Sequence, residues 1–489
     1  MFGSLRQKAT SGLIWSALER FGKQGVVFVV QIVLARVLAP EQFGLVAMVV
    51  VFLALSSIIA DAGFSRALVQ RKEVGDKEVS TVFYFNLGIS CVMTLVLYVV
   101  APYIADFFDF NELTLILRIL SIRLVIDAFG SVHASMLSRQ LRFKEIFWVT
   151  LPSTLLSGII AIALALNGFG VWALVGQNLI QAILLSLAFW ARSDWRPKYI
   201  FDVQCLKEML PYGSRLALSA FIDRTFENIY VLVIGKVYTA VDLGYFQRAR
   251  SLQRLPVDSI QEVLGRVMFP LFTKIQDDPV RMKSGMRKAL QLSALLVFPG
   301  MALLSSISEP MIVTLLGLKW LPSVPYLKWL CLVGALYPVH AVNVNILLAI
   351  GRSDLILKMS IFKKVLVVIN VAITAPFGIQ TMVYGIIVSS VIALGINSYY
   401  TKQFINYTLL EQCKDVFPMI CISVIIFIVN GGLLMIVPFS DHVTLLTTFC
   451  ASGLVFLIGM PFIGSTLKHE LAILVSKLPA ARLLLTVLR

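Results

Sequence analysis

Long apolar segments separated by short polar connections recur from one end of the chain to the other. Each segment is about 20 residues long, the length at which a helix crosses the hydrocarbon core of a bilayer. The segments lie near residues 10–34, 43–67, 81–105, 113–137, 149–167, 171–190, 209–235, 243–270, 287–306, 326–349, 357–375, 380–400, 416–437 and 442–463. Because backbone groups in hydrocarbon must be hydrogen-bonded within their own segment, the pattern predicts an all-α polytopic membrane protein of about fourteen transmembrane helices.

Composition agrees with lipid as the solvent. Of the 489 residues, 58% are hydrophobic and 14% are charged, whereas about a quarter of the residues of a soluble protein are charged. The basic N-terminus followed by an apolar stretch resembles a signal peptide. However, Glu19, Arg20 and Lys23 interrupt that stretch, and no small-residue cleavage site follows it. We therefore expect the stretch to be the first membrane helix.

The net charge of +15 is explained by where the Lys and Arg residues lie, and it does not predict a nucleic-acid partner. Outside the apolar segments, about 26 of them fall on one set of alternate connections. The other set holds only Arg36, Lys236 and Lys319. Cytoplasmic loops of membrane proteins carry such an excess, so we expect both termini to lie in the cytoplasm.

The last part of the chain, residues 466–489, has a different pattern. It alternates Lys and Arg with Leu, Ile and Val around Pro479. This alternation favours an amphipathic helix that lies on the anionic inner leaflet. A frayed tail is the alternative.

Three short sequence matches recur in order at a nearly constant offset. They pair residues 35–44 with 235–244, residues 117–120 with 327–330, and residues 169–170 with 377–378. Such a repeat predicts two lobes of six helices, residues 1–200 and 201–405, related by an axis along the membrane normal. The helices of residues 406–465 would then be two additional ones at the C-terminal end.

About 13 Lys and Arg fall inside the apolar segments, where each costs about 2.5–3.5 kcal/mol if it faces lipid at mid-bilayer. The repeat makes helices one and seven equivalent, so we expect them to face each other across a central cleft. The cations predicted to line this cleft are Arg20, Lys23, Arg224, Arg250 and Arg254. Since a guanidinium binds phosphate through two parallel hydrogen bonds, they predict an anion site.

Acidic residues accompany these cations and leave a second interpretation open. Arg123 with Asp127, Arg254 with Asp258, and Glu262 with Arg266 are each spaced four apart on a helix. Such pairs are also typical of ion pairs that hold helices together. The excess of cations over acids favours the anion site for the cluster as a whole.

Motifs for catalysis or metal binding are absent from the sequence. It contains no nucleotide-binding G-x-x-x-x-G-K-[ST], no G-x-S-x-G and no H-E-x-x-H. The six cysteines and the four histidines are dispersed, without metal-ligand spacing. We expect no enzymatic activity, no metal and no cofactor.

Several longer motifs resemble those of the Wzx-type polysaccharide exporters. In the first half they are Ser11-Gly12-x-x-Trp15-Ser16, the run from Leu34 to Gly44, Asp61-Ala62-Gly63-Phe64-Ser65 and Gln70-Arg71-Lys72. In the second half Arg266-Val267-Met268-Phe269-Pro270, Lys274 to Asp278, Leu316 to Trp320 and Gly351 to Asp354 resemble the colanic-acid and teichuronic-acid exporter branch. The resemblance covers nearly the whole chain.

This resemblance implies a bacterial inner-membrane flippase for undecaprenyl-diphosphate-linked oligosaccharide repeat units, used in exopolysaccharide, capsule or O-antigen biosynthesis. It implies two six-helix lobes around a cationic cavity with two extra helices, and kinship with multidrug exporters and the lipid II flippase. Candidate partners are the lipid-linked oligosaccharide, the membrane, and the polymerase and export machinery of the same pathway. The family has no strict substrate-binding motif, so the site residues rest on depth and charge.

The resulting hypothesis is alternating access, with the diphosphate on Arg20, Lys23, Arg224, Arg250 and Arg254. A proton or a sodium ion would reset the cycle on one of the nearby acids, which are Glu19, Asp127, Asp223, Glu227 and Asp258. A cation-coupled multidrug antiporter is one alternative, although it would favour acids over cations in the cavity. A membrane glycosyltransferase or polymerase is another, although it would need a large outer loop with catalytic carboxylates.

Overall fold

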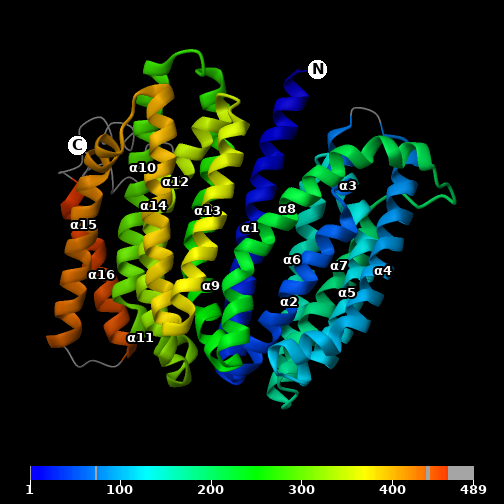
Figure 1. Ribbon diagram of the computed structural model, residues 1–489, viewed down its shortest axis with the longest axis horizontal. Coiled ribbons are helices and arrows are strands. Elements are labelled where there is room, and N and C mark those ends of the chain that lie inside the picture. Colours follow the sequence, from blue (N-terminus) through cyan, green and yellow to red (C-terminus); the bar gives the residue numbers. More distant parts are fainter. Residues whose placement is uncertain (1, 72–73, 437–440, 461–489) are drawn as a thin grey trace. The chain divides into compact units, whose positions relative to one another are not determined.

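The computed structural model describes residues 2–71, 74–436 and 441–460, and helices are the regular secondary structure of these residues (Figure 1). Each of the fourteen predicted segments overlaps one long helix. In chain order these are α1 (Phe2–Val37), α2 (Pro40–Asp61), α4 (Asp76–Phe108), α5 (Glu112–Arg139), α6 (Phe143–Leu166), α7 (Val171–Arg192), α8 (Val203–Val237), α9 (Ala240–Lys274), α10 (Pro279–Ser306), α12 (Val324–Ala349), α13 (Ser353–Thr374), α14 (Ile379–Ile405), α15 (Leu409–Ile436) and α16 (Asp441–Gly459). The short elements α3 (Phe64–Gln70), α11 (Ser308–Leu316), η1 (Leu318–Ser323) and η2 (Ala375–Phe377) complete the described part of the chain.

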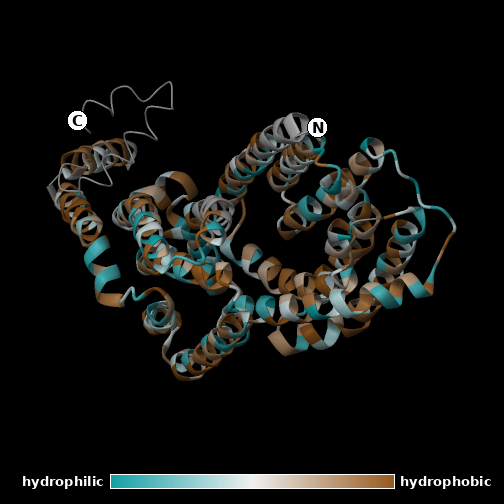
Figure 2. Ribbon diagram, turned by 90° about the horizontal axis from the view of Figure 1, so that it is seen from above, coloured by the Kyte–Doolittle hydropathy of each residue, from teal (hydrophilic) through white to brown (hydrophobic). Residues whose placement is uncertain are grey.

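Eight helices of the described residues are long and apolar enough to cross a membrane, and hydrophobic residues predominate along the helices (Figure 2). They are α2, α4, α6, α7, α10, α12 with η1 before it, α14 and α15. The long helices outside this set include α1, α5, α8, α9 and α13. These five carry most of the charges inside the predicted segments. The polytopic all-α architecture is therefore confirmed, whereas the number of crossings stays a prediction.

The first compact unit extends to Gly244 and contains α1 to α8 with the first turn of α9. In it α1 packs on α6, α6 on α7, α7 on α5, and α5 on α4. The buried face of α6 consists of small residues, among them Ser157, Gly158 and Ala161, which let its neighbours approach closely. Its α8 packs on α2, α3 and α4.

The second unit begins at Tyr245. Its α10 packs against both α12 and α15, and α14 packs against α12 and α13. A buried apolar cluster joins α10, α12 and α15 through residues such as Leu290, Ile346 and Met419. The predicted lobes, 1–200 and 201–405, were defined by sequence symmetry and not by compactness, and they stay a prediction.

One contact gives the predicted repeat a structural counterpart. Gly44 and Gly244 occupy equivalent positions in the sequence match at an offset of 200. A Cβ on Gly44 would lie 1.8 Å from the carbonyl oxygen of Ala240, and a Cβ on Gly244 would lie 2.1 Å from that of Pro40. Each glycine therefore contacts the residue four positions before its counterpart. This reciprocity, within the first unit, is what a two-fold relation between the starts of α2 and α9 requires.

The predicted amphipathic tail, residues 466–489, lies outside the described residues.

Candidate functional site

The charged residues of α1 lie opposite an exposed apolar face of that helix. Ile14, Leu18 and Phe21 are about half exposed or more and follow helical spacing. Glu19, Arg20 and Lys23 lie on the opposite side of the helix and are half-buried. These three charged side chains are therefore less exposed than the apolar face of α1, a helix that packs on α6.

The second cluster of charges in the first unit lies on α8. Asp223 and Arg224 are exposed, and Glu227 is half-buried. The Arg224 guanidinium donates to the Glu227 carboxylate at 2.7 Å, within one helical turn. The predicted diphosphate ligand Arg224 is therefore already paired with one of the predicted ion-coupling acids.

The ion pair on α5 supports the helix-linking interpretation for these residues. Arg123 donates through Nε to Asp127 at 3.1 Å and through Nη1 to Asn178 of α7 at 2.5 Å. Two N–H groups of one guanidinium thus fasten α5 to itself and to α7. Asp127 is engaged in this pair, which leaves it less available as a coupling acid.

In the second unit, α9 carries Arg250, Arg254 and Asp258, all half-buried. Arg254 and Asp258 lie 3.9 Å apart, a looser pair than those on α5 and α8. Both charges act on the hydroxyl of Tyr337 of α12, so this part of α9 lies near α12. The side chains of Glu262 and Arg266 lie outside the described residues. The anion site as a whole stays a prediction.

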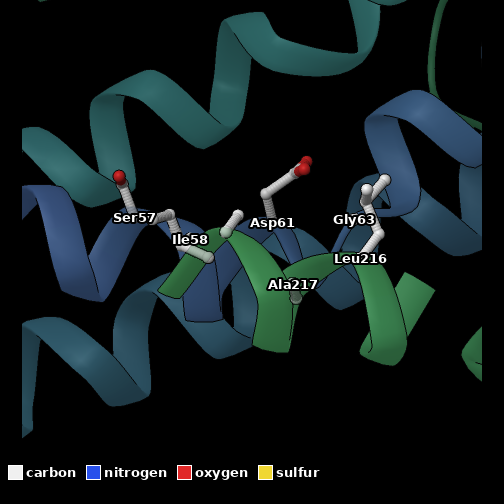
Figure 3. Close-up of a pocket in the computed structure, with 7 residues that line it drawn as sticks. Ser57, Ile58, Asp61, Gly63, Leu216 and Ala217 are labelled. Atoms are coloured by element: carbon white, nitrogen blue, oxygen red, sulfur yellow. The ribbon is translucent and has the colours of Figure 1, made fainter. Parts of the chain in front are cut away.

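The first unit also contains a small cavity that the positions of the charged residues in the sequence did not predict. It has a volume of about 250 Å³ and lies between α2 and α8, with Ser57, Asp61 and Leu216 among its lining residues (Figure 3). The Asp61 carboxylate accepts hydrogen bonds from the Ser65 hydroxyl and from the Asn86 amide, the latter at 3.4 Å. In the sequence, Asp61 stands out only as the first residue of the motif Asp61 to Ser65, which resembles the Wzx-type exporters.

A larger cavity, of about 650 Å³, lies within the second unit and is almost entirely apolar. It is bounded by α10, α12 and α15, with Phe298, Trp329 and Phe427 among its walls. Lys328 is the charged member of its lining. Its chemistry therefore fits a long hydrocarbon with an anionic end.

Ion pairs also fasten the basic connections between helices. Arg142 binds Asp194 at 2.8 Å, and Arg352 binds Asp354 at 2.8 Å. The Arg352 guanidinium lowers the pKa of Asp354 to about 2, because its hydrogen bonds favour the charged carboxylate. Much of the positive charge predicted to face the cytoplasm thus has acidic partners next to it.

Comparisons with known proteins identify what this chain is similar to. Residues 33–325 match the family described as polysaccharide biosynthesis protein. The chain is 32% identical over 303 residues to the teichuronic acid biosynthesis protein TuaB of Bacillus subtilis. This match covers 61% of this chain and 62% of TuaB, so the chain spans less than two thirds of the length of TuaB. It is 27% identical to the lipopolysaccharide biosynthesis protein WzxC of Escherichia coli over 74% of each chain. It is 28% identical to the succinoglycan biosynthesis transport protein ExoT of Rhizobium meliloti, over 79% of this chain and 78% of that protein.

Two solved structures share the fold. The lipid II flippase MurJ in an inward closed conformation superposes with a TM-score of 0.73 at 18% identity, covering 91% of this chain and 98% of MurJ. An inward-facing multidrug resistance transporter of the MATE family and MOP superfamily superposes with a TM-score of 0.62 at 17% identity, covering 78% of this chain and 94% of that one. At these identities the likeness establishes the fold alone, a polytopic bundle of helices.

Proposed function

The chain belongs to the polysaccharide biosynthesis protein family, and we propose on this premise that it flips lipid-linked oligosaccharide repeat units across the bacterial inner membrane. The substrate would be an oligosaccharide on undecaprenyl diphosphate, moved from the cytoplasmic to the periplasmic face by alternating access. The polymerase and export machinery of the same pathway would take the product. Both termini would be cytoplasmic, as the distribution of Lys and Arg favours.

The observation that carries this proposal is the excess of cations on the long helices too polar to face lipid. Arg20, Lys23 and Arg224 lie on α1 and α8, and Arg250 and Arg254 lie on α9. The helices α1, α8 and α9 are not among the apolar spans of the described residues. Cations that are costly in hydrocarbon are retained where an anion crosses the membrane, and a diphosphate is such an anion.

The apolar cavity of the second unit suits the other part of the same substrate. A polyprenyl chain is a long hydrocarbon that ends in a phosphate, and this cavity has apolar walls with one lysine, Lys328. Burying apolar surface contributes roughly 25 cal/mol per Å², so even part of the chain would bind appreciably. The glycan, which is polar, would remain in an aqueous cavity.

The alternatives have less support. A multidrug antiporter shares the fold, but the family and the curated relatives belong to polysaccharide biosynthesis. A glycosyltransferase or polymerase would need a large outer segment with catalytic carboxylates, whereas the connections α6–α7 and α13–α14 contain only a few residues.

The test is the double substitution Arg224→Gln with Arg254→Gln. It would be expressed in a strain that lacks its own flippase for the pathway and depends on this chain. We expect surface polysaccharide to fall at least tenfold and lipid-linked repeat units to accumulate, because two predicted diphosphate ligands are lost. The amount and monodispersity of the purified protein would be measured alongside, to show that it remains folded.

A matched control removes the same charge elsewhere. Arg281 and Arg352 are exposed and paired with Asp278 and Asp354 outside the apolar segments. The double variant Arg281→Gln with Arg352→Gln should export at the wild-type level. Full export by the Arg224→Gln, Arg254→Gln variant would overturn the assignment of the anion site.

A further inference from the structure

A histidine within the helix bundle of the second unit has hydrogen bonds at both ring nitrogens. His340 of α12 lies against α14, where its Nε2 is 3.0 Å from the Ser390 hydroxyl. Its Nδ1 is 3.0 Å from the Nδ2 of Asn397. The imidazole is half-buried, and Asn397 is fully buried. Polar groups at this depth are costly unless they are paired, and ionisable ones commonly mark ion or proton pathways.

Both partners of this imidazole can either donate or accept a hydrogen bond. A hydroxyl does so by rotating its proton, and a primary amide does so by turning its oxygen in place of its nitrogen. As placed, Asn397 donates to Nδ1, so the neutral ring carries its proton on Nε2 and donates to Ser390. If Nδ1 took up a proton, Asn397 would release its own donation, turn over and accept from Nδ1–H through its oxygen. The ring would then keep two hydrogen bonds as a cation, with no movement of the helices.

The acceptor that this change requires is present and unused. Among the described residues, the Oδ1 of Asn397 is buried and has no hydrogen-bond partner. A buried amide oxygen without a partner costs about 1–3 kcal/mol. Proton uptake by His340 would give this oxygen a charge-assisted bond, while the amide NH2 group would take the position that has no partner.

The charged groups around His340 come from several helices. Lys363 of α13 acts directly on the imidazole, and Arg254 and Asp258 of α9 act on Tyr337, one turn away on α12. The apolar stretches 289–306 of α10 and 385–398 of α14 contain no titratable residue. Glu309 of α11 and Lys319 of η1 precede the first residue of α12, about 24 Å of helix from His340. Lys363 is thus the charged group that acts on the imidazole itself, whereas the Arg254–Asp258 pair acts on its neighbour Tyr337.

Hydrogen-bonded residues continue from this position toward the start of α15. Asn343, one turn beyond His340, forms a reciprocal amide pair with Gln412 at 2.9 and 3.3 Å. Gln412 also accepts from Ser398, the neighbour of Asn397, and donates to the backbone of Tyr407. The Tyr407 hydroxyl then donates to Asp415 at 2.6 Å. These residues therefore form a column of polar groups that begins one turn from His340 on α12 and ends at Asp415 of α15.

We propose that His340, with Ser390 and Asn397, is a proton-binding site and that its proton is the coupling ion of the transport cycle. This inference rests on the proposed function. It also assigns a group other than the acids named above, of which Asp127, Glu227 and Asp258 are each paired with an arginine. Protonation would add a positive charge one turn from Tyr337, on which Arg254 of the predicted anion site acts. Substrate and proton would then influence each other through a short stretch of α12.

The direct test is nitrogen NMR of the full chain labelled with ¹⁵N-histidine in detergent, from pH 8 to pH 4. The signals of His340 are identified by their loss in His340→Gln. We expect them to change from one protonated and one bare ring nitrogen to two protonated nitrogens. In Asn397→Leu the same change should require at least a tenfold higher proton concentration, because the acceptor for Nδ1–H is gone. A ring that keeps one bare nitrogen over the whole range, or an unchanged titration in Asn397→Leu, would overturn the site.

The coupling role is tested by export. Gln can donate and accept hydrogen bonds but cannot take up a proton, so His340→Gln should remain folded and lose export at least tenfold. The control is His133→Phe, since His133 is the fully buried histidine of the described residues. Full export by His340→Gln would overturn the coupling role while leaving the flippase assignment intact. Conversely, proton binding by His340 in a chain that exports no repeat units would count against the flippase and not against the site.

Discussion

Two glycines in each compact unit lie against different kinds of neighbour. In the first unit Gly44 and Gly63 approach the backbone of other elements, at Ala240 and Gly213. In the second unit Gly334 and Gly385 make room for side-chain amides, those of Gln253 and Asn370. The first arrangement brings helix backbones into contact, and the second accommodates polar side chains between helices.

One histidine in each unit shows a similar difference. In the first unit His133 is fully buried between Trp190 and Trp195, at ring distances of 4.7 and 5.2 Å. Neither of its nitrogens has a hydrogen-bond partner among the described residues. In the second unit His340 has a partner at each nitrogen. One histidine is packed as an aromatic ring, whereas the other is kept as a polar group.

The difference fits the division of work that the two proposals imply. The first unit has backbone contacts at Gly44 and Gly63 and keeps Arg224 and Asp223 exposed. The second unit admits a column of amides and a histidine to its interior. A unit of the first kind is suited to present charge to a substrate, and one of the second kind is suited to hold a proton away from lipid.

The largest effect should follow from adding a methyl group where two backbones meet. Gly44→Ala would place Cβ 1.8 Å from a carbonyl oxygen that cannot move without its helix, so we expect a loss of more than about 3 kcal/mol. Gly385→Ala meets the Oδ1 of Asn370 at 1.7 Å, but a side chain can rotate, so a loss of about 1–2 kcal/mol is expected. Thermal unfolding of the purified protein in detergent measures both.

The controls for Gly44→Ala and Gly385→Ala are other glycines that lie within helices. Gly88 of α4 and Gly395 of α14 have no other heavy atom within 4 Å of an added Cβ. Alanine there should be neutral or stabilising by up to about 1 kcal/mol, because it favours the helix. If Gly385→Ala destabilised more than Gly44→Ala, the contrast between backbone and side-chain packing would be wrong.

A smaller effect should distinguish the amide pairs of the two units. Asn343 and Gln412 are buried and bonded in both directions, whereas Gln31 and Gln177 of the first unit share a part-buried contact at 3.5 Å. Double-mutant cycles to Leu should give a coupling of about 1 kcal/mol for the first pair and less than about 0.5 kcal/mol for the second. Equal couplings would show that the buried amide pair of the second unit is no more strongly coupled than the part-buried pair of the first.

The sequence was sufficient to predict the helices, because apolar segments of bilayer length are a local property. Their ends depended on single residues. The second segment was predicted to extend to residue 67, but α2 ends at Asp61, since Ala62 and Gly63 adopt left-handed backbone angles with φ of 45° and 76°. Likewise α8 begins at Val203, before the predicted residue 209, because the Asp202 side chain caps it.

The candidate site was less accessible to prediction. Positions of charges inside the helices were predicted, and the pairing of Arg123 with Asp127 was one of the two interpretations left open, because residues four apart on a helix are neighbours. The environment of His340 was not, since Ser390 and Asn397 are 50 and 57 residues away in the chain. Only the packing of α12 on α14 brings them together, and no spacing in the sequence indicates it.

The smallest effect concerns a surface ion pair at the start of α8, outside the buried parts of both units. It shows how much a surface pair contributes, against which the effects of the buried contacts can be compared. Asp202 accepts from Lys77 at 3.0 Å and from the backbone of Gln204 and Cys205. The Lys77 hydrogen bond and then these N–H groups lower its pKa below the ordinary value of 3.8. A lowered pKa adds stability above the ordinary value, which is lost as the pH falls through the folded value. Asp202→Asn keeps the helix cap but not the charge, so its unfolding midpoint should lie slightly below wild type at pH 7 and approach it as the pH falls below 3.8 and through the lowered folded pKa. Asp202→Ala, which also lacks the cap, should stay below wild type throughout. A gap for Asp202→Asn that does not narrow as the pH falls would show that hydrogen-bond geometry, and not charge, stabilises this connection.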